Sequence, residues 1–368
     1  MRWSPPPLLT GVECATMELL STIETKEEET EMKITTIGLD LAKNVFHVVC
    51  FDARHQEVSK RMLRRSQVLG YFAQREPCVV AMEACAGAHY WGRELEKLGH
   101  TAKLIPPQFV KPYVKGNKND YNDARAIAEA ATRPGMRFVG IQTVEQQDLQ
   151  ALHRLRAQRI KERTALCNQL RALVAEYGIV MNKGVAALRR GIPGLLEDAE
   201  NGLSEAFRAL LARGYEQLIE LEGPIDHYTR QVEAHGRQDE RTRRLQTLPG
   251  FGPIVASVFA SAVGDGSAFK RGRDVSACLG LVPRQHSSGG KEVLLGISKR
   301  GDKYLRSLLI HGARSVVLHA KHKEDALSRW VNRIRERRGT NKAAVALANK
   351  LARMGWAVLR NETVYRPA

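Results

Sequence analysis

The chain has 368 residues, enough for two or three domains with cores of their own. Its 57 Lys and Arg exceed its 40 Asp and Glu and give a net charge of +17, which predicts a polyanionic partner such as DNA or RNA. No run approaches the roughly 20 apolar residues of a membrane span, and the six cysteines include no Cys-x-x-Cys pair. The sequence therefore predicts no membrane partner, no zinc site, no disulfide framework and a reducing, cytoplasmic setting.

The first 31 residues differ in composition from the rest. They hold seven Glu against one Arg and one Lys, and they include the run Pro5-Pro6-Pro7. A weakly patterned segment with charge of mainly one sign predicts a disordered extension over residues 1–31. Met32 directly precedes the first predicted strand, so we expect translation to start there.

Residues 32–143 alternate between apolar strands and helices, which predicts an α/β domain. Helices are expected at 66–74, 88–98 and 119–131, and strands at 34–39, 45–51, 57–63, 78–82 and 102–105. The predicted order is three strands, then two strands that each follow a helix, and then a last helix. This is the order of elements in the ribonuclease H fold. In that fold the first and fourth strands are neighbours. His47, in the second strand, is expected to be an ordinary core or rim residue.

Four carboxylates fall at the ends of these elements. Asp40 ends the first strand, Glu83 ends the fourth, and Asp120 and Asp123 share one face at the start of the last helix. Oxygen ligands from three elements suit two Mg²⁺ ions of the kind that phosphoryl-transfer enzymes use. The alternative is structural, with Asp40 capping a turn, Glu83 at a rim, and the two later acids stabilising a helix N-terminus.

Residues 144–245 predict a helical arm. Leucines recur at helical spacing, and the steps from Leu211 to Leu218 and from Ile225 to Val232 are those of a heptad. We predict two long helices that form a coiled-coil hairpin or a dimer arm. Glycines and Pro193 interrupt the pattern between residues 178 and 194. Leu155, Leu173, Tyr177 and Leu210 are expected in the apolar stripes.

Residues 246–368 form a basic C-terminal region. Residues 241–368 hold 25 Lys and Arg against eight Asp and Glu, a net charge of +17, so this third of the chain is the expected nucleic-acid platform. The segment Leu248-Pro-Gly-Phe-Gly-Pro253 resembles the hairpin of helix-hairpin-helix elements. Its Gly250 and Gly252 would let backbone N–H groups approach a phosphate. A helix is predicted over 303–319.

A polar, glycine-rich loop over residues 280–291 contains Ser287 and Ser288. On composition alone these are ordinary loop residues, and His286 beside them is only a possible base. The surrounding sequence is cationic, however, and cations near a serine can hold a phosphate beside it and stabilise developing charge. The cations are Arg284, Lys291, Lys299, Arg300 and Arg306.

Five segments, in this order, resemble the insertion-sequence transposases of the IS110 family and in particular its IS1111 branch. The resemblance runs from Met32 to the C-terminus. It implies a RuvC-like domain over 32–143, a coiled-coil arm over 144–245 and a transposase domain over 246–368. The segments are Gly38-Leu-Asp-Leu-Ala-Lys43, Met82-Glu-Ala-Cys-Ala-Gly87, Asn117-Lys-Asn-Asp-Tyr-Asn-Asp-Ala124, Leu248-Pro-Gly-Phe-Gly252 and Ser287-Ser-Gly-Gly-Lys291 with Ser298-Lys-Arg-Gly-Asp302.

The resemblance also implies which residues act. The family's Asp-Glu-Asp-Asp set maps onto Asp40, Glu83, Asp120 and Asp123. Its nucleophilic serine maps onto Ser288, with Ser287 left open by the spacing. Further implications are a homo-oligomer (dimer or tetramer), in which two half-sites meet between protomers, and a structured guide RNA from the element's flank.

The expected function is transposition of an insertion sequence in the bacterial cytoplasm, at the nucleoid, by Mg²⁺-dependent attack of Ser288 on DNA phosphodiesters. One alternative is a metal-dependent junction-resolving endonuclease, which would use the same four acids with water as the nucleophile. Another is a non-catalytic DNA- or RNA-binding protein. Ser288→Ala would abolish the transposase and spare the endonuclease, whereas Asp40→Ala would change only the stability of a non-catalytic protein.

Overall fold

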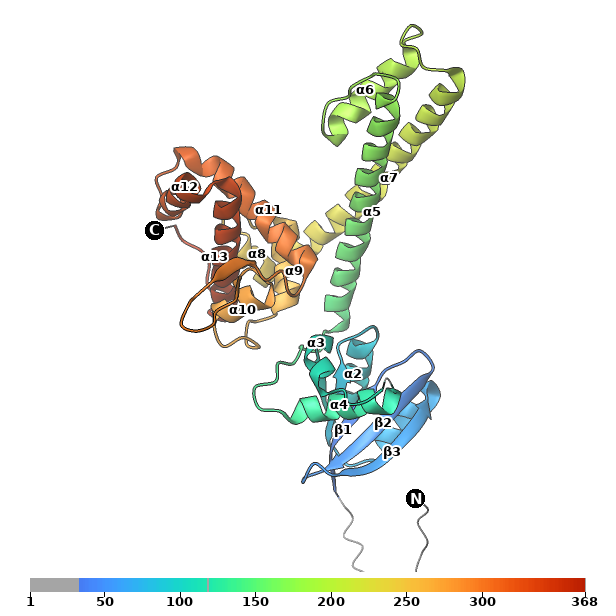
Figure 1. The fold of residues 1–368 in the computed structure, drawn as a ribbon, viewed down its shortest axis with the longest axis vertical. Helices are drawn as coiled ribbons and strands as arrows, with labels where there is room; N and C mark the ends of the chain where they lie inside the picture. The colour runs from blue at the N-terminus through green and yellow to red at the C-terminus, as the bar shows by residue number, and fades with distance from the viewer. Residues whose placement is uncertain (1–32, 118, 368) are drawn as a thin grey trace, which may run out of the picture. The chain divides into compact units, whose positions relative to one another are not determined.

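The structure, a computed structural model, describes residues 33–117 and 119–367. The extension predicted over residues 1–31 and the expected start at Met32 lie outside the described residues. Two compact units divide between Val139 and Gly140 (Figure 1).

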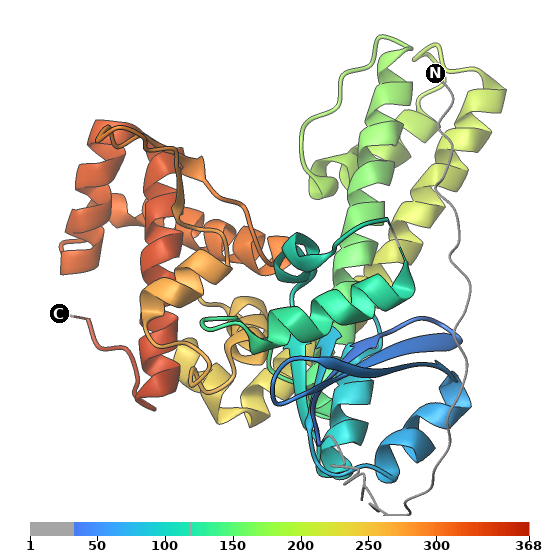
Figure 2. The same ribbon diagram turned by 60° about the horizontal axis from the view of Figure 1, so that its bottom comes forward.

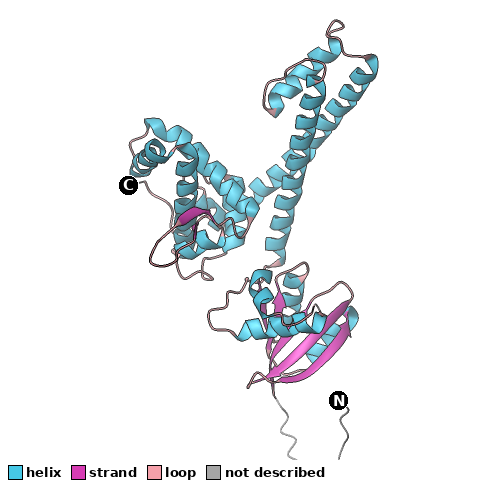
Figure 3. Cartoon of the chain, viewed as in Figure 1, coloured by secondary structure: helices cyan, strands magenta, loops and turns pink. Residues whose placement is uncertain are grey.

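A five-stranded sheet organises the first unit (Figures 1 and 3), with the strand order β3-β2-β1-β4-β5. Neighbours β1–β2 and β2–β3 are antiparallel, whereas β4 runs parallel to both β1 and β5. The first and fourth strands are therefore neighbours, as predicted, and the unit is compatible with a RuvC-like ribonuclease H fold. The strands are β1 (Ile34–Asp40), β2 (Val45–Asp52), β3 (Glu57–Arg64), β4 (Val79–Glu83) and β5 (Thr101–Ile105).

Helices cover both faces of this sheet (Figure 2). On one face lie α1 (Val68–Ala73) and α2 (Ala88–Lys97), and on the other lies α4 (Asp120–Thr132). The helix expected over 66–74 is present as the 3-10 turn η1 (Arg65–Gln67) followed by α1. Two short helical segments were not predicted, α3 (Pro107–Val110) and η2 (Lys111–Tyr113).

Close packing of α4 on β1 depends on Gly38. A Cβ built at Gly38 would overlap the carbonyl oxygen of Ala124 and lie 2.9 Å from both the nitrogen and the Cβ of Ala128. No larger residue fits there without moving the helix. The absence of a side chain at this one strand position thus lets the helix backbone rest directly on β1.

A long helical hairpin begins the second unit (Figure 1), formed by α5 (Val144–Ala175) and α7 (Glu205–Gln238) packed against each other. The heptad-spaced residues are all buried, because they form the face of α7 turned toward its neighbours. They are at most 4% exposed: Leu211, Leu218, Ile225 and Val232.

Two features of this hairpin differ from the prediction. Four residues assigned to the apolar stripes are exposed instead: Leu155, Leu173, Tyr177 and Leu210. Part of the segment read as an interruption is a helix, α6 (Val185–Glu197), with Pro193 inside it. Burial of Leu188 and Ile192 in the core shared with α5 and α7 compensates for the backbone hydrogen bond that proline removes.

Up to residue 367, the rest of the second unit contains α13 and six further helical segments, and Leu347 and Leu351 of α13 are fully buried in their shared core. The helix predicted over 303–319 is confirmed as α11. The segments are α8 (Glu240–Leu245), α9 (Pro253–Val263), α10 (Gly272–Cys278), α11 (Lys303–His319), η3 (Ala320–His322), α12 (Ala326–Arg338) and α13 (Thr340–Arg360).

The predicted glycine-rich loop is a two-stranded ribbon, formed by β6 (Pro283–Gln285) and β7 (Leu294–Ile297). Gly289 and Gly290 have φ of +55° and +77°, the pair of values that a tight hairpin turn requires. A further bridge joins Ser288 to Lys291 on either side of this turn. The glycines therefore make a defined turn rather than an irregular loop.

None of the helices within 33–117 and 119–367 is both long and apolar enough to cross a membrane. Disulfide bonds are absent among the cysteines of these ranges, which are Cys50, Cys78, Cys85, Cys167 and Cys278.

Candidate active site

Two acids end neighbouring strands at one edge of the sheet. The parallel register of β1 and β4 pairs Leu39 with Met82. The residues that follow them, Asp40 and Glu83, are the last residues of their strands. Sheet pairing thus brings together two carboxylates that are 43 positions apart in the sequence.

The N-terminus of α4 supplies the other two acids. Asn119 caps this helix, since its side-chain oxygen accepts a hydrogen bond from the backbone N–H of Tyr121 at 2.9 Å. Asp120 and Asp123 occupy the first turn. Because Gly38 lets α4 lie directly on β1, this turn is held close to the end of that strand.

Asp40 and Glu83 each feel the charges of other acids of this set. Burial raises the pKa of Asp40, and the charges of Asp123 and Asp120 raise it further. Burial also raises the pKa of Glu83, followed by the charges of Asp40 and Asp123. The structure therefore concentrates negative charge at this sheet edge and makes the ionised forms of Asp40 and Glu83 costly.

The donor chemistry of the four acids fits a divalent cation. They offer hard oxygen ligands from β1, β4 and α4, and a cation would offset the repulsion that raises the two pKa values. With the side chains as they stand, however, no group of three or more His, Cys, Asp or Glu among the described residues is arranged to hold a metal ion. Binding would therefore have to draw the carboxylates closer together.

His47 is a neighbour of this cluster that the sequence analysis assigned to the core or rim. It is 9% exposed and lies opposite Asp40 in the β1–β2 register. Its Nδ1 lies 3.6 Å from an Asp120 carboxylate oxygen and has no hydrogen-bond partner among the described residues. The turn at Lys43-Asn44 sets the register of the β1–β2 hairpin, and this register could have shown from the sequence that His47 lies opposite Asp40.

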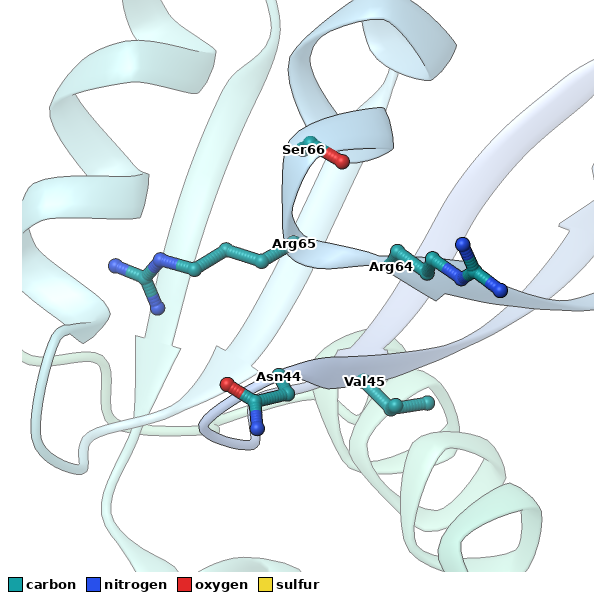
Figure 4. Close-up of a pocket in the computed structure, with 5 residues that line it drawn as sticks. All are labelled: Asn44, Val45, Arg64, Arg65 and Ser66. Atoms are coloured by element: carbon teal, nitrogen blue, oxygen red, sulfur yellow. The ribbon is translucent and has the colours of Figure 1, made fainter.

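A shallow cavity of about 520 Å³ lies where β2 begins, just beyond the turn that follows Asp40 (Figure 4). Arg64 and Arg65 line it and point in opposite directions. The Arg65 N–H donates to the Asn44 carbonyl at 2.9 Å, and its guanidinium lies 5.1 Å from the centre of the Trp91 ring. The sequence analysis did not single out these two cations, and the structure places them at the start of β2, next to the turn that follows Asp40.

The serine ribbon, residues 283–297, presents its two serines differently. The Ser287 Oγ accepts hydrogen bonds from the Val293 N–H at 3.3 Å and from the Gln285 side-chain amide at 3.0 Å. Ser288 takes part through its backbone, with its carbonyl accepting from the Lys291 N–H at 3.0 Å. The Ser288 hydroxyl forms no hydrogen bond within the described chain and is exposed.

The cations predicted around the serines fall into two groups. Arg284, Lys291, Lys299 and Arg300 are exposed near the ribbon. Arg306 is 8% exposed, and its Nη1 donates to the carbonyls of Leu279 and Arg300 at 3.0 and 2.7 Å. The structure therefore gives Arg306 a structural role in holding the loop, and a phosphate contact from it stays a prediction.

The two glycines of the predicted hairpin also differ. Gly250 has φ of +83° and packs its backbone against Gly312 of α11. Helix packing is therefore one sufficient reason for a glycine at position 250. Gly252 is exposed, precedes α9, and a Cβ there would meet open space. Approach of either backbone to a phosphate stays a prediction.

Comparison with known proteins places this fold and site in a class. A family model described as "Transposase", of the DEDD type of IS110 elements, matches residues 37–179, and one described as "Transposase IS116/IS110/IS902 family" matches residues 242–328. These matches define an insertion-sequence transposase, an enzyme that recombines DNA. They also indicate use of a divalent metal ion.

Relatives cover nearly the whole chain. A probable family 20 transposase of Pseudomonas aeruginosa is 50% identical over 91% of this chain and 100% of its own length. The transposase for insertion sequence element IS1111A of Coxiella burnetii is 45% identical over 98% and 99%. A pilin gene-inverting protein of Moraxella bovis is 25% identical over 89% and 97%. The chain belongs to the IS110/IS116/IS902 family of transposases.

Proposed function

We propose that the protein moves its insertion sequence by serine attack on DNA phosphodiesters, assisted by two Mg²⁺ ions at Asp40, Glu83, Asp120 and Asp123. The observation that carries this proposal is the gathering of these four acids at one sheet edge, with the pKa of Asp40 and Glu83 raised by burial and mutual repulsion. Magnesium ions held there would offset the charge on the phosphate oxygens and on the leaving oxygen.

Ser288 is the proposed nucleophile. Its Oγ forms a bond to phosphorus while one ester P–O bond of the DNA breaks, and the serine proton ends on the leaving oxygen. The resulting phosphoserine link keeps the ester, so a second DNA hydroxyl can attack it, restore a phosphodiester and return the proton to Ser288. The unengaged hydroxyl of Ser288, compared with the doubly hydrogen-bonded hydroxyl of Ser287, supports this choice.

Cations around the ribbon are proposed to hold the DNA backbone. Arg284, Lys291, Lys299 and Arg300 are exposed, and Gly250 and Gly252 lie in a turn between α8 and α9 that resembles a helix-hairpin-helix element. Binding through phosphates predicts that DNA affinity falls steeply with salt, since each neutralised phosphate releases counterions. Affinity that stays flat with salt would contradict this assignment.

The α5/α7 hairpin is proposed to be a coiled-coil arm that joins copies of the chain into a dimer or tetramer. Exposed Leu155, Leu173 and Leu210 on these two helices support an apolar contact there. Following the family resemblance, we further propose that a structured guide RNA directs the DNA choice, and that the protein works in the bacterial cytoplasm at the nucleoid.

A suicide substrate tests this function. The full chain is incubated with Mg²⁺, RNA from the element's flank and nicked element-end DNA, and protein–DNA adducts that survive denaturation are measured. We expect an adduct with wild type and with Ser287→Ala, and none with Ser288→Ala or Asp40→Ala. Metal-dependent cleavage that persists in Ser288→Ala without an adduct would instead support the junction-resolving endonuclease.

A further inference from the structure

A second cavity, of about 440 Å³, lies among α5, α9 and the start of α11. Its lining includes small or slender side chains, which we call its floor: Ala157, Val258, Ser261 and Ala262. Two amides of α5, Gln150 and Gln158, also line it, and Tyr304 of α11 adds an aromatic wall. The volume is that of a small-molecule site, and no residue in the proposed chemistry lies in it.

Hydrogen bonds fix the walls of this cavity, which we call the α5/α9 pocket. His153 on α5 is 1% exposed, and its Nε2 lies 2.9 Å from the Ser257 Oγ on α9. The Tyr304 hydroxyl lies 3.5 Å from the His153 Nδ1. Asp302 accepts from the backbone N–H groups of Tyr304 and Leu305 and so begins α11. The cavity is therefore built between three elements that are tied to one another.

Two cations flank the pocket along α5. Arg154 and Lys161 are exposed and lie two helical turns apart on the same face. Within the described chain neither forms a hydrogen bond or an ion pair, whereas Arg159 on the same helix is paired with Glu162 at 2.7 Å. The cations beside the pocket are thus available for an anion from outside.

The combined chemistry is that of a nucleotide. An aromatic wall and an apolar floor suit a base, amides offer both donors and acceptors to its edge, and the flanking cations suit the phosphates on either side. A base can enter only where it is unstacked, so the ligand is single-stranded. We propose that this pocket captures one unstacked nucleotide of the nucleic acid on which the transposase acts. This inference rests on the proposed function.

The position of the pocket gives the capture a consequence. Asp302 and Tyr304 begin α11, and the segment just before them leads back to the serine ribbon through Gly301. A Cβ at Gly301 would overlap the carbonyl oxygen of Cys278, so this connection is closely packed. A nucleotide held at Tyr304 would therefore help to fix where the strand lies relative to Ser288.

The test fills the pocket without changing charge. Ala262 is an exposed floor residue, so Ala262→Phe blocks the cavity at little cost to folding; Ala209→Phe, at an exposed alanine on α7, is the matched control. Affinities of the full-length variants are measured by fluorescence anisotropy with labelled single strands of about 16 nucleotides, as DNA, as RNA and as fully abasic DNA. Thermal melting checks that both variants fold like wild type.

We expect Ala262→Phe to weaken binding of single-stranded DNA, RNA or both by about 5-fold to 150-fold, the range for loss of one base-stacking contact. The larger loss identifies the source strand, and the loss should vanish on abasic DNA, where wild type and variant bind alike. The double variant Arg154→Gln/Lys161→Gln should reduce the slope of log affinity against log salt by about 1.4. The control variant, Arg190→Gln at an exposed position on α6, should reduce this slope by at most about half as much.

Equal affinities of wild type and Ala262→Phe for every base-containing strand would overturn the pocket and leave the proposed function standing. An equal loss in Ala209→Phe, or an undiminished loss on abasic DNA, would also overturn it. A wild-type protein that binds none of these strands and no duplex DNA would overturn both the pocket and the proposed function.

Discussion

Gly38→Ala perturbs the contact that holds α4, and with it Asp120 and Asp123, against β1. The added Cβ would overlap the Ala124 carbonyl oxygen and lie 2.9 Å from the Ala128 nitrogen, where ordinary contacts begin at 3.4 Å. Both neighbours are backbone atoms and cannot rotate away. To clear Ala128 alone the helix must retreat by about 0.5 Å, and further to clear Ala124. Overpacking of this kind costs about 1–3 kcal/mol, and we expect the upper end.

The assay is hydrogen exchange of the backbone amides of β1 and β4, read by mass spectrometry, because it reports the opening of this sheet separately from the second unit. A loss of about 3 kcal/mol corresponds to roughly 150-fold faster exchange where opening is global. Adduct formation should fall as well, since the first turn of α4 moves away from Asp40.

Gly70→Ala is the matched control, because Gly70 lies in α1 and a Cβ there meets nothing within 4 Å. It should leave exchange unchanged or slow it, since alanine favours a helix by about 1 kcal/mol over glycine. If the amides of β1 and β4 exchange as slowly in Gly38→Ala as in Gly70→Ala, the close approach of α4 to β1 is refuted.

Three further predictions concern charge and packing. Burial lowers the pKa of His153 to about 4 from an ordinary 6.5, so on acidification the unfolded chain takes up this proton before the folded chain does. The free energy of unfolding is therefore unaffected above pH 6.5, falls as the pH drops toward 4, and is lower by about 2 kcal/mol at pH 5. Urea titrations across this pH range should show that fall in wild type and a weaker pH dependence in His153→Gln. Asp40→Asn should raise the melting temperature, because it removes a carboxylate whose ionisation is opposed by burial, Asp123 and Asp120, and it should also abolish the adduct. Mg²⁺ should raise the melting temperature of wild type more than that of this variant. Equal shifts in the two proteins would argue against a metal ion at Asp40. Gly301→Ala should destabilise the second unit far more than Gly296→Ala, because only at Gly301, where φ is +72°, would the Cβ overlap a backbone oxygen; similar melting of the two would contradict that packing.

Much of the first unit could be predicted from local pattern, because its strands are apolar runs bounded by turns. The strands around Ile37 and Val80 were predicted within one residue of their bounds. The fold that the order of elements indicates also predicted that these two strands are neighbours, and the structure adds that they are parallel. The heptad of α7 was visible for the same reason, since burial on one face imposes a period on the sequence. The sequence also placed the four candidate acids where such elements begin or end, and the structure has them there; their catalytic role stays a prediction.

What local pattern missed depends on contacts between distant segments. Exposure of Leu155 and Leu210 depends on which face of the hairpin is covered, and the spacing of leucines alone does not decide this. Helix α6 forms around Pro193 because of burial that residues far along the chain provide. The close fit at Gly38 and the role of Arg306 in holding carbonyls likewise involve partners far away in sequence. Residue composition carries no signal for such contacts.

The central claim is that Ser288 becomes covalently linked to DNA. The most direct measurement is mass spectrometry of the protease-digested adduct trapped on a nicked element end, with the nucleotide-bearing residue identified by fragmentation. The account predicts a nucleotide phosphate on the Ser288 Oγ in a Mg²⁺-dependent reaction. A modification on Ser287, on another residue, or cleaved DNA with no modified peptide would contradict it.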